Sequence, residues 1–124
     1  MVSAYKKLIS RFLCIGTEWF PRKGGLSTFN RQLAITLASC GYEVHCYLPD
    51  FTEEEALDAK EKNVSLIKAK QSKGQNDIER LSQKPTDLDF DVIIGHDIVT
   101  GPAMADLKMN YYKIKNYSLF QIFF

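Results

Sequence analysis

The sequence predicts an α/β fold in which a parallel β-sheet is flanked by helices. Short apolar runs alternate along the chain with segments whose apolar residues recur at helical spacing. The apolar runs lack clean polar alternation, as is typical of strands that are covered on both faces. Strands that alternate with helices favour parallel pairing through right-handed crossovers. The length of 124 residues, with 45% hydrophobic and 25% charged residues, fits one soluble globular domain.

The first expected elements are a strand over residues 11–15 and a helix over residues 26–40. The strand is a short apolar run that ends at Gly16. The helix has apolar residues at positions i, i+3, i+7 and i+11, which form one face of a 3.6-residue period. Gly41 follows it, where a left-handed residue commonly ends a helix. Residues 16–25, which read GTEWFPRKGG, therefore connect a strand to a helix.

This connection, here called the glycine turn, has the composition of an anion-binding loop. A helix N-terminus carries unsatisfied N–H groups and a partial positive charge that attract phosphate. Gly24 and Gly25 allow a ligand to reach the backbone, and Lys23 adds a charge beside them. Neither the G-x-G-x-x-G dinucleotide fingerprint nor a P-loop is present. The alternative is a strand-to-helix turn that simply needs flexible residues.

The next expected unit is a strand over residues 43–48 followed by a helix over residues 52–62. Pro49 ends the strand, because proline cannot continue a central strand. Thr52 and Glu55 form the Thr-x-x-Glu pattern of a capping box, which predicts the start of the helix.

Two further strands are expected, over residues 64–69 and 91–95. The polar stretch 70–84 between them predicts at most a short amphipathic helix. A helix over residues 102–108 follows the last strand, with a proline in its first turn. The expected order is thus βαβαβ(α)βα.

His96 and Asp97 directly follow the strand expected at residues 91–95. Ligands of parallel sheets bind beyond the carboxyl ends of the strands. The glycine turn follows another strand at the same edge, so both features are expected to face one crevice. The alternative is a His–Asp hydrogen bond that only fixes a loop.

Several other residues have a less distinctive sequence context. Trp19 and Phe20 are expected in an exposed loop, where they pack over the glycine turn or stack on a sugar or base. We expect Arg22 in solvent and His45, in the middle of a strand, as a structural histidine. Asp50 occupies the place of the ribose-binding acid of dinucleotide folds, but without the glycine fingerprint we interpret it as a turn residue.

Composition excludes several classes of protein. A net charge of +1 argues against binding to nucleic acid, and no apolar run is long enough to span a membrane. Residues 12–15 are too short for the apolar core of a signal peptide. Two histidines without a convergent ligand set do not predict a metal site. Cys14, Cys40 and Cys46 form no Cys-x-x-Cys pair, so we expect a cytoplasmic protein with buried, unreactive thiols.

Residues 109–124 differ in composition from the rest of the chain. Of these 16 residues, 13 are Phe, Tyr, Ile, Met, Asn or Lys, whose codons begin with two A or T bases. This bias favours the hypothesis that the tail is a translation of AT-rich non-coding DNA, such as an unspliced intron. The alternative is a genuine final strand over residues 117–124.

Two segments resemble a known family. Residues 16–49, GTEWFPRKGGLSTFNRQLAITLASCGYEVHCYLP, resemble the N-terminal Rossmann-like domain of GT-B glycosyltransferases, and more narrowly family 4, with glycogen synthases as close relatives. The matching positions in this segment are Glu18, Pro21, Gly24, Gly25, Leu33, Ala34, Leu37, Ala38, Gly41, Tyr42, Glu43 and Val44. Residues 91–107, DVIIGHDIVTGPAMADL, are similar to the family's Asp-Val-(Ile/Val)-x-x-His-Asp-x-x-Thr-Gly stretch. The matching positions there are Asp91, His96, Asp97, Thr100 and Gly101.

The resemblance implies a retaining transfer of a sugar from a nucleotide-diphosphate sugar to a glycan or small-molecule acceptor. The nucleotide sugar would be the donor substrate, and no separate cofactor is implied. The residues implied at the donor phosphates are Lys23, Gly24 and Gly25. Those implied at the catalytic centre are His96 and Asp97. Those implied to support the loop or face the acceptor are Glu18, Thr100 and Gly101.

GT-B enzymes place their site between two Rossmann-like domains, and no segment here matches the second one. We therefore expect residues 1–108 to be an incomplete N-terminal half-domain of a GT-B fold, and residues 109–124 an atypical tail. Such a fragment is expected to be inactive alone. Two alternatives are a non-catalytic module that binds a nucleotide sugar or a partner, and half of a dinucleotide-dependent oxidoreductase. The glycine turn argues against the oxidoreductase.

Overall fold

The computed structural model describes residues 11–22, 24–71, 73–95, 102–103, 106–107 and 120–121. The strands in this part of the chain form one sheet in the order β3-β2-β1-β4-β5, in which every neighbouring pair is parallel. They are β1 (Arg11–Ile15), β2 (Glu43–Leu48), β3 (Val64–Lys68), β4 (Val92–Gly95) and the short β5 (Phe120–Gln121). The sequence prediction of an α/β fold with a parallel sheet is confirmed.

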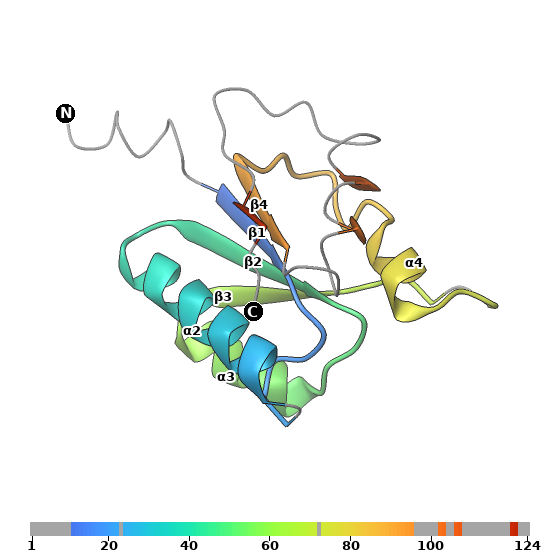
Figure 1. Ribbon diagram of the computed structural model, residues 1–124. Coiled ribbons are helices and arrows are strands. Elements are labelled where there is room, and N and C mark those ends of the chain that lie inside the picture. Colours follow the sequence, from blue (N-terminus) through green and yellow to red (C-terminus); the bar gives the residue numbers. More distant parts are fainter. Residues whose placement is uncertain are drawn as a thin grey trace.

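The helices are α2 (Gly25–Ser39), α3 (Glu53–Glu61) and α4 (Asp77–Leu81), shown in Figure 1. The α3 helix begins with the expected capping box, because Thr52 Oγ1 accepts from the Glu55 N–H and the Glu55 side chain accepts from the Thr52 N–H. The α4 helix begins with a second capping box, between Asn76 and Glu79. Of the helix expected at residues 102–108, the described residues 102–103 and 106–107 are helical.

Alternate residues of the strands enter two separate apolar clusters on the two faces of the sheet. Phe12 and Cys14 belong to the cluster that α2 and α3 cover. Leu13 and Ile15 belong to the cluster that includes Leu81 of α4. Figure 1 shows α2 and α3 side by side and α4 apart from them. The helices therefore flank both faces, which gives a Rossmann-like arrangement.

The strand order reverses direction between β1 and β4. From β1 the sheet grows through β2 to β3, and the chain then returns to place β4 on the other side of β1. In open α/β sheets, ligands bind at such a reversal, beyond the carboxyl ends of the strands. The glycine turn follows β1, and His96 is the residue that follows β4 in the sequence.

The prediction of buried cysteines is right for two thiols and wrong for the third. Cys14 and Cys46 are register partners on adjacent strands, and both are fully buried. A hydrogen bond with Cys14, together with burial, raises the pKa of the Cys46 thiol well above its ordinary value. Cys40 is exposed: it is the C-cap residue of α2 and belongs to neither apolar cluster.

The tail expected at residues 109–124 lies outside the described residues except for β5. Phe120 pairs with Ile94 and Gln121 with Gly95, in parallel register. These two residues lie within the final strand that was the alternative interpretation of the tail. The non-native origin of the tail and the boundary at residue 108 stay predictions.

Candidate functional site

The first residue of the glycine turn, Gly16, still forms a hydrogen bond with the neighbouring strand. The Gly16 N–H donates to the Tyr47 carbonyl oxygen of β2 at 3.1 Å. A Cβ atom at Gly16 would lie 2.6 Å from Asn30 Nδ2 of α2 and 3.2 Å from a methyl carbon of Leu48. A larger residue at this position would therefore displace the buried side chains of Asn30 and Leu48, so a glycine fits best here.

Near the end of the turn, Gly24 is the N-cap residue of α2. Gly24 has φ 95° and ψ −140°, a backbone conformation that side chains rarely allow. No side chain caps the helix, and its first turn contains no acidic residue. The first helical hydrogen bond runs from the Thr28 N–H to the Gly24 carbonyl oxygen, so the N–H groups of residues 25–27 lie ahead of the helical ladder.

The space beside this helix start is open. A Cβ atom built at Gly24 or at Gly25 would meet no atom within 4 Å. An uncapped helix N-terminus with an open glycine flank has the geometry and the partial charge that suit an anion. The predicted phosphate site needs an uncapped helix start and open space beside Gly24 and Gly25, and the structure has both.

Trp19 is not in an exposed loop, so that prediction is wrong. Its side chain is fully buried in the cluster that α2 and α3 cover. Its indole N–H donates to Asp58 Oδ2 of α3 at 2.8 Å, and the Arg31 guanidinium carbon lies 5.1 Å from the ring centroid. The indole can be buried completely because α3 supplies an acceptor for its polar group.

Phe20 is half-buried and packs against the same cluster, which agrees with packing over the turn rather than stacking on a ligand. Its backbone N–H donates to Glu55 Oε2 at 2.9 Å. The other carboxylate oxygen of Glu55 accepts from the Thr52 N–H at 3.0 Å. Burial raises the pKa of Glu55, but the hydrogen bonds from Phe20 and Thr52 outweigh this effect, so its pKa lies below the ordinary value.

A small open pocket of about 180 Å³ lies beside the glycine turn. It is formed between the turn and the segment that follows β2, at the carboxyl ends of β1 and β2. Its lining residues are Glu18, Arg22, Asp50, Phe51, Thr52 and Glu55. Arg22 is exposed, as predicted, and it is the basic residue of a lining that also contains three carboxylates.

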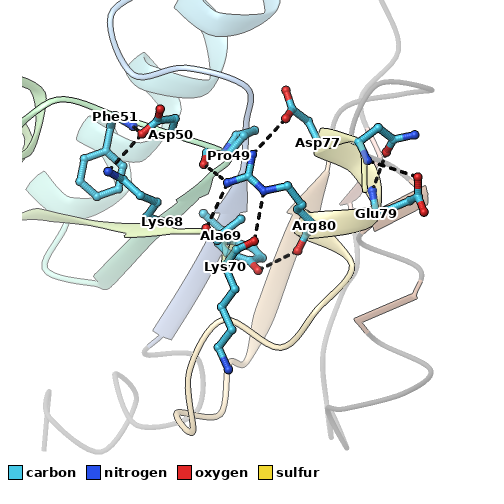
Figure 2. Close-up of polar contacts among 11 residues, drawn as sticks. Pro49, Asp50, Phe51, Lys68, Ala69, Lys70, Asp77, Glu79 and Arg80 are labelled. Atoms are coloured by element: carbon cyan, nitrogen blue, oxygen red, sulfur yellow. Dashed lines mark hydrogen bonds and ion pairs between the residues drawn. The ribbon is translucent and has the colours of Figure 1, made fainter. Parts of the chain in front are cut away.

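Asp50 has the contacts of a turn residue, as Figure 2 shows. Its Oδ1 accepts from the Phe51 N–H at 2.9 Å and pairs with Lys68 Nζ at 3.1 Å. The hydrogen bonds from Lys68 and Phe51 lower the pKa of Asp50. The Lys68 ammonium also lies 5.0 Å from the centroid of the Phe51 ring. One lysine therefore contacts two neighbouring residues of the pocket wall, Asp50 and Phe51.

Arg80 of α4 binds Pro49, the residue directly before Asp50 of this wall, as Figure 2 shows. Its side chain is buried, and its guanidinium donates to three backbone carbonyl oxygens and pairs with one carboxylate. The acceptors are Pro49 at 2.7 Å, Lys70 at 3.1 Å, Ala69 at 3.2 Å and Asp77 at 3.2 Å. Sequence reasoning missed the role of Arg80, although the short amphipathic helix expected within residues 70–84 is present as α4.

Several predicted site residues lie outside the described residues. They are Lys23, His96, Asp97, Thr100 and Gly101. The structure describes Gly24 and Gly25 at the helix start and Glu18 in the pocket wall. The predicted roles of all these residues stay predictions.

His45 has the structural role that the sequence predicted. Its Nε2 lies 2.8 Å from Glu43 Oε2, and its ring packs edge-on against Phe90 at a centroid distance of 5.5 Å. Hydrogen bonds from His45 and Arg11 outweigh burial and lower the pKa of Glu43. This pair lies in the first half of β2, away from the carboxyl ends of the strands.

Two findings concern only the described part of the chain. It contains no group of three or more His, Cys, Asp or Glu side chains arranged to hold a metal ion. None of its helices has both the length and the apolar character that crossing a bilayer requires.

Comparison with protein families gave a match that covers residues 13–121. The matching family is described as "Family 4 Glycosyltransferase in conflict systems". The match includes the glycine turn, the pocket wall and the segment after β4. Comparison with curated proteins and with solved structures gave no match.

Proposed function

This chain belongs to the family 4 glycosyltransferases of conflict systems, and we propose that its glycine turn binds the phosphates of a nucleotide-diphosphate sugar. Membership of the family implies a sugar donor and an acceptor as substrates. The observation that carries the proposal is the uncapped start of α2 beside Gly24 and Gly25, at the carboxyl end of β1.

The chemistry of this helix start suits a diphosphate. Phosphate oxygens accept charge-assisted hydrogen bonds from backbone N–H groups, each worth about 1.5–3 kcal/mol when the partner is charged. The helix dipole adds a favourable interaction of about 0.3–1 kcal/mol at an exposed end. Lys23, directly before the glycine pair in the sequence, would supply a further positive charge.

The proposed reaction is a transfer with retention. The bond between the anomeric carbon and the diphosphate oxygen breaks, and a bond from the same carbon to an acceptor hydroxyl oxygen forms on the same face. The hydroxyl proton passes to the leaving diphosphate. Negative charge develops on the leaving diphosphate, where preorganised N–H donors stabilise the transition state most. In this proposal His96 and Asp97 act at the reacting sugar. The nucleotide sugar and the acceptor are the two substrates, and the proposal includes no separate cofactor.

The pocket beside the turn supports an acceptor-side role for Glu18. Carboxylate oxygens accept hydrogen bonds from hydroxyl groups, and the Arg22 guanidinium donates them. In this proposal Thr100 and Gly101 belong to the same side of the site. Asp50 is engaged by Lys68 and the Phe51 N–H, which does not favour the ribose-binding role of a dinucleotide oxidoreductase.

The described strands form a single sheet. In this proposal the sheet provides one wall of the cleft in which the donor binds. The resemblance to GT-B enzymes implies that a second domain supplies most nucleotide contacts. We therefore propose that the chain alone is the N-terminal part of such an enzyme and binds the diphosphate without turnover. A cytoplasmic location stays a prediction of the sequence.

A titration of the isotope-labelled chain, followed by nuclear magnetic resonance, tests the phosphate site. Uridine diphosphate is expected to shift the amide signals of Gly24 and Gly25 in a saturable way, and uridine is expected to leave them unchanged. In the same sample, UDP-glucose and ADP-glucose should not be consumed. Unchanged glycine signals at millimolar diphosphate would refute the phosphate site, and sugar transfer by the purified chain would refute inactivity.

A further inference from the structure

One carboxylate oxygen of α3 binds residues on both sides of the Gly24–Gly25 pair. Asp58 Oδ2 accepts from Trp19 Nε1 at 2.8 Å, and Trp19 precedes the pair in the chain. The same oxygen accepts from Arg31 Nη2 at 2.8 Å, and Arg31 follows the pair, within α2. Asp58 therefore fixes the loop and the helix relative to each other, and the glycine pair lies between the two contacts.

Asp58 has one further charged partner, and Arg31 also contacts Trp19 directly. The other oxygen of Asp58, Oδ1, accepts from Lys62 Nζ at 2.9 Å, and the Arg31 guanidinium lies over the Trp19 ring. Hydrogen bonds from Lys62, Arg31 and Trp19 hold the pKa of Asp58 well below its usual range. The carboxylate is thus ionised at neutral pH, and each of its oxygens has a charged partner.

Glu55 adds a second contact from the same face of α3, since residues three apart on a helix are neighbours. It accepts the backbone N–H of Phe20, the residue after Trp19. Two carboxylates of α3 therefore hold consecutive residues of the loop, one through a side chain and one through the backbone. The position of the loop therefore depends on α3 as well as on its own residues.

We propose that Asp58 is a positioning residue for the glycine turn. By fixing Trp19 and Arg31 together, it orients the N–H groups at the start of α2 toward the donor diphosphate. In this role Asp58 acts through Trp19 and Arg31 rather than through a contact with the diphosphate. The inference rests on the proposed function, because it supplies the geometry that a preorganised phosphate site requires.

The experiment compares the variants Asp58→Ala and Asp58→Asn with two controls in the full chain. Lys62→Gln removes the third partner of Asp58 without touching the loop or α2. Leu81→Ala removes a fully buried side chain from the cluster on the opposite face of the sheet. The readouts are hydrogen exchange of residues 16–25 and the affinity for pyrophosphate, followed by the Gly24 and Gly25 amide signals.

Asp58→Ala is expected to increase hydrogen exchange in the turn and to weaken pyrophosphate binding, each by about tenfold, the factor that corresponds to one lost charge-assisted hydrogen bond. Asp58→Asn keeps one acceptor oxygen and should show a smaller effect. Lys62→Gln should leave both quantities unchanged. Leu81→Ala should lower global stability without a selective loss of protection in the turn.

An unchanged turn in folded Asp58→Ala would overturn the inference, and so would an equal, selective loss of protection in Leu81→Ala. If Asp58→Ala does not fold, Trp19→Phe takes its place, because it keeps a buried aromatic ring and removes the indole N–H. If the wild-type chain binds no pyrophosphate, the proposed function fails. Hydrogen exchange in the turn still tests the positioning role in that case.

Discussion

Arg80 Nη2 donates a hydrogen bond of 2.7 Å to the backbone carbonyl oxygen of Pro49, and so ties α4 to the end of β2. The next residues of the chain, Asp50 to Thr52, line the pocket beside the glycine turn. A helix on one face of the sheet thereby positions a segment that borders the proposed site. Because the same guanidinium also binds Ala69, it fixes the end of β3 against the end of β2.

Replacing Arg80 with methionine is expected to lower the free energy of unfolding by about 3 kcal/mol, because it leaves buried carbonyl groups without a donor. Arg80→Lys should also destabilise, since one ammonium cannot donate to three carbonyls with the geometry of the planar guanidinium. Urea unfolding measures both effects. Asp77→Asn is the matched control. Asp77 is an exposed partner of Arg80, so its loss should change stability by less than about 0.5 kcal/mol.

Local sequence patterns predicted the secondary structure well. The expected strand over residues 43–48 has the bounds of β2, and the Thr52–Glu55 capping box starts α3 as predicted. Both features depend on residues that are close in sequence. The α2 helix was expected one residue late at each end, a difference within the usual uncertainty of helix boundaries.

Contacts between distant residues were not predictable in the same way. The sequence around Trp19 indicates a loop residue near glycines. Its burial depends on Asp58, which lies 39 positions away in the sequence. Arg80 donates to backbone carbonyls, which every residue carries, so no side-chain pattern marks its partners. The residues of the proposed site were all named from the sequence or from the family resemblance. The α3 carboxylates Glu55 and Asp58, which hold the turn, were not connected with the site at that stage.

Stability is expected to fall as the pH drops below about 4, partly through Asp58. The folded-state pKa of Asp58 is depressed, so its contribution is present above the unfolded-state pKa of about 3.9 and is lost as the pH falls through the folded-state pKa. Asp58→Asn should be less stable than the wild type at pH 7, and its stability should change less between pH 5 and pH 2. Urea unfolding at a series of pH values checks this, and parallel pH profiles for the two proteins would contradict it.

The three cysteines are expected to differ in reactivity because of their exposure. Cys40 is exposed, whereas Cys14 and Cys46 are fully buried on adjacent strands. A thiol reagent that releases a coloured product should therefore modify one cysteine in the native chain and all three in urea. Cys40→Ser should abolish the fast reaction. Fast modification of two or more thiols under native conditions would show that the sheet opens.

Substitutions at Gly24 and Gly25 are expected to affect stability differently, which separates an effect on folding from an effect on ligand binding. Gly24 has φ 95°, so Gly24→Ala should lower the free energy of unfolding by about 1–3 kcal/mol. Gly25 has no such constraint, and a Cβ atom there meets no protein atom within 4 Å. Gly25→Ala should therefore be as stable as the wild type or more stable, because alanine favours a helix over glycine by about 1 kcal/mol.

Gly25→Ala should nevertheless weaken pyrophosphate binding, because the added methyl group occupies the open space from which an anion would approach the backbone. Isothermal titration calorimetry measures the affinity, and urea unfolding measures the stability of the same samples. A matched control is Gly74→Ala, at a positive-φ glycine outside the glycine turn that also has no atom within 4 Å of its built Cβ. This control should lose stability and keep the wild-type affinity. Equal affinity of Gly25→Ala and the wild type would mean that the anion does not approach along the glycine flank of α2.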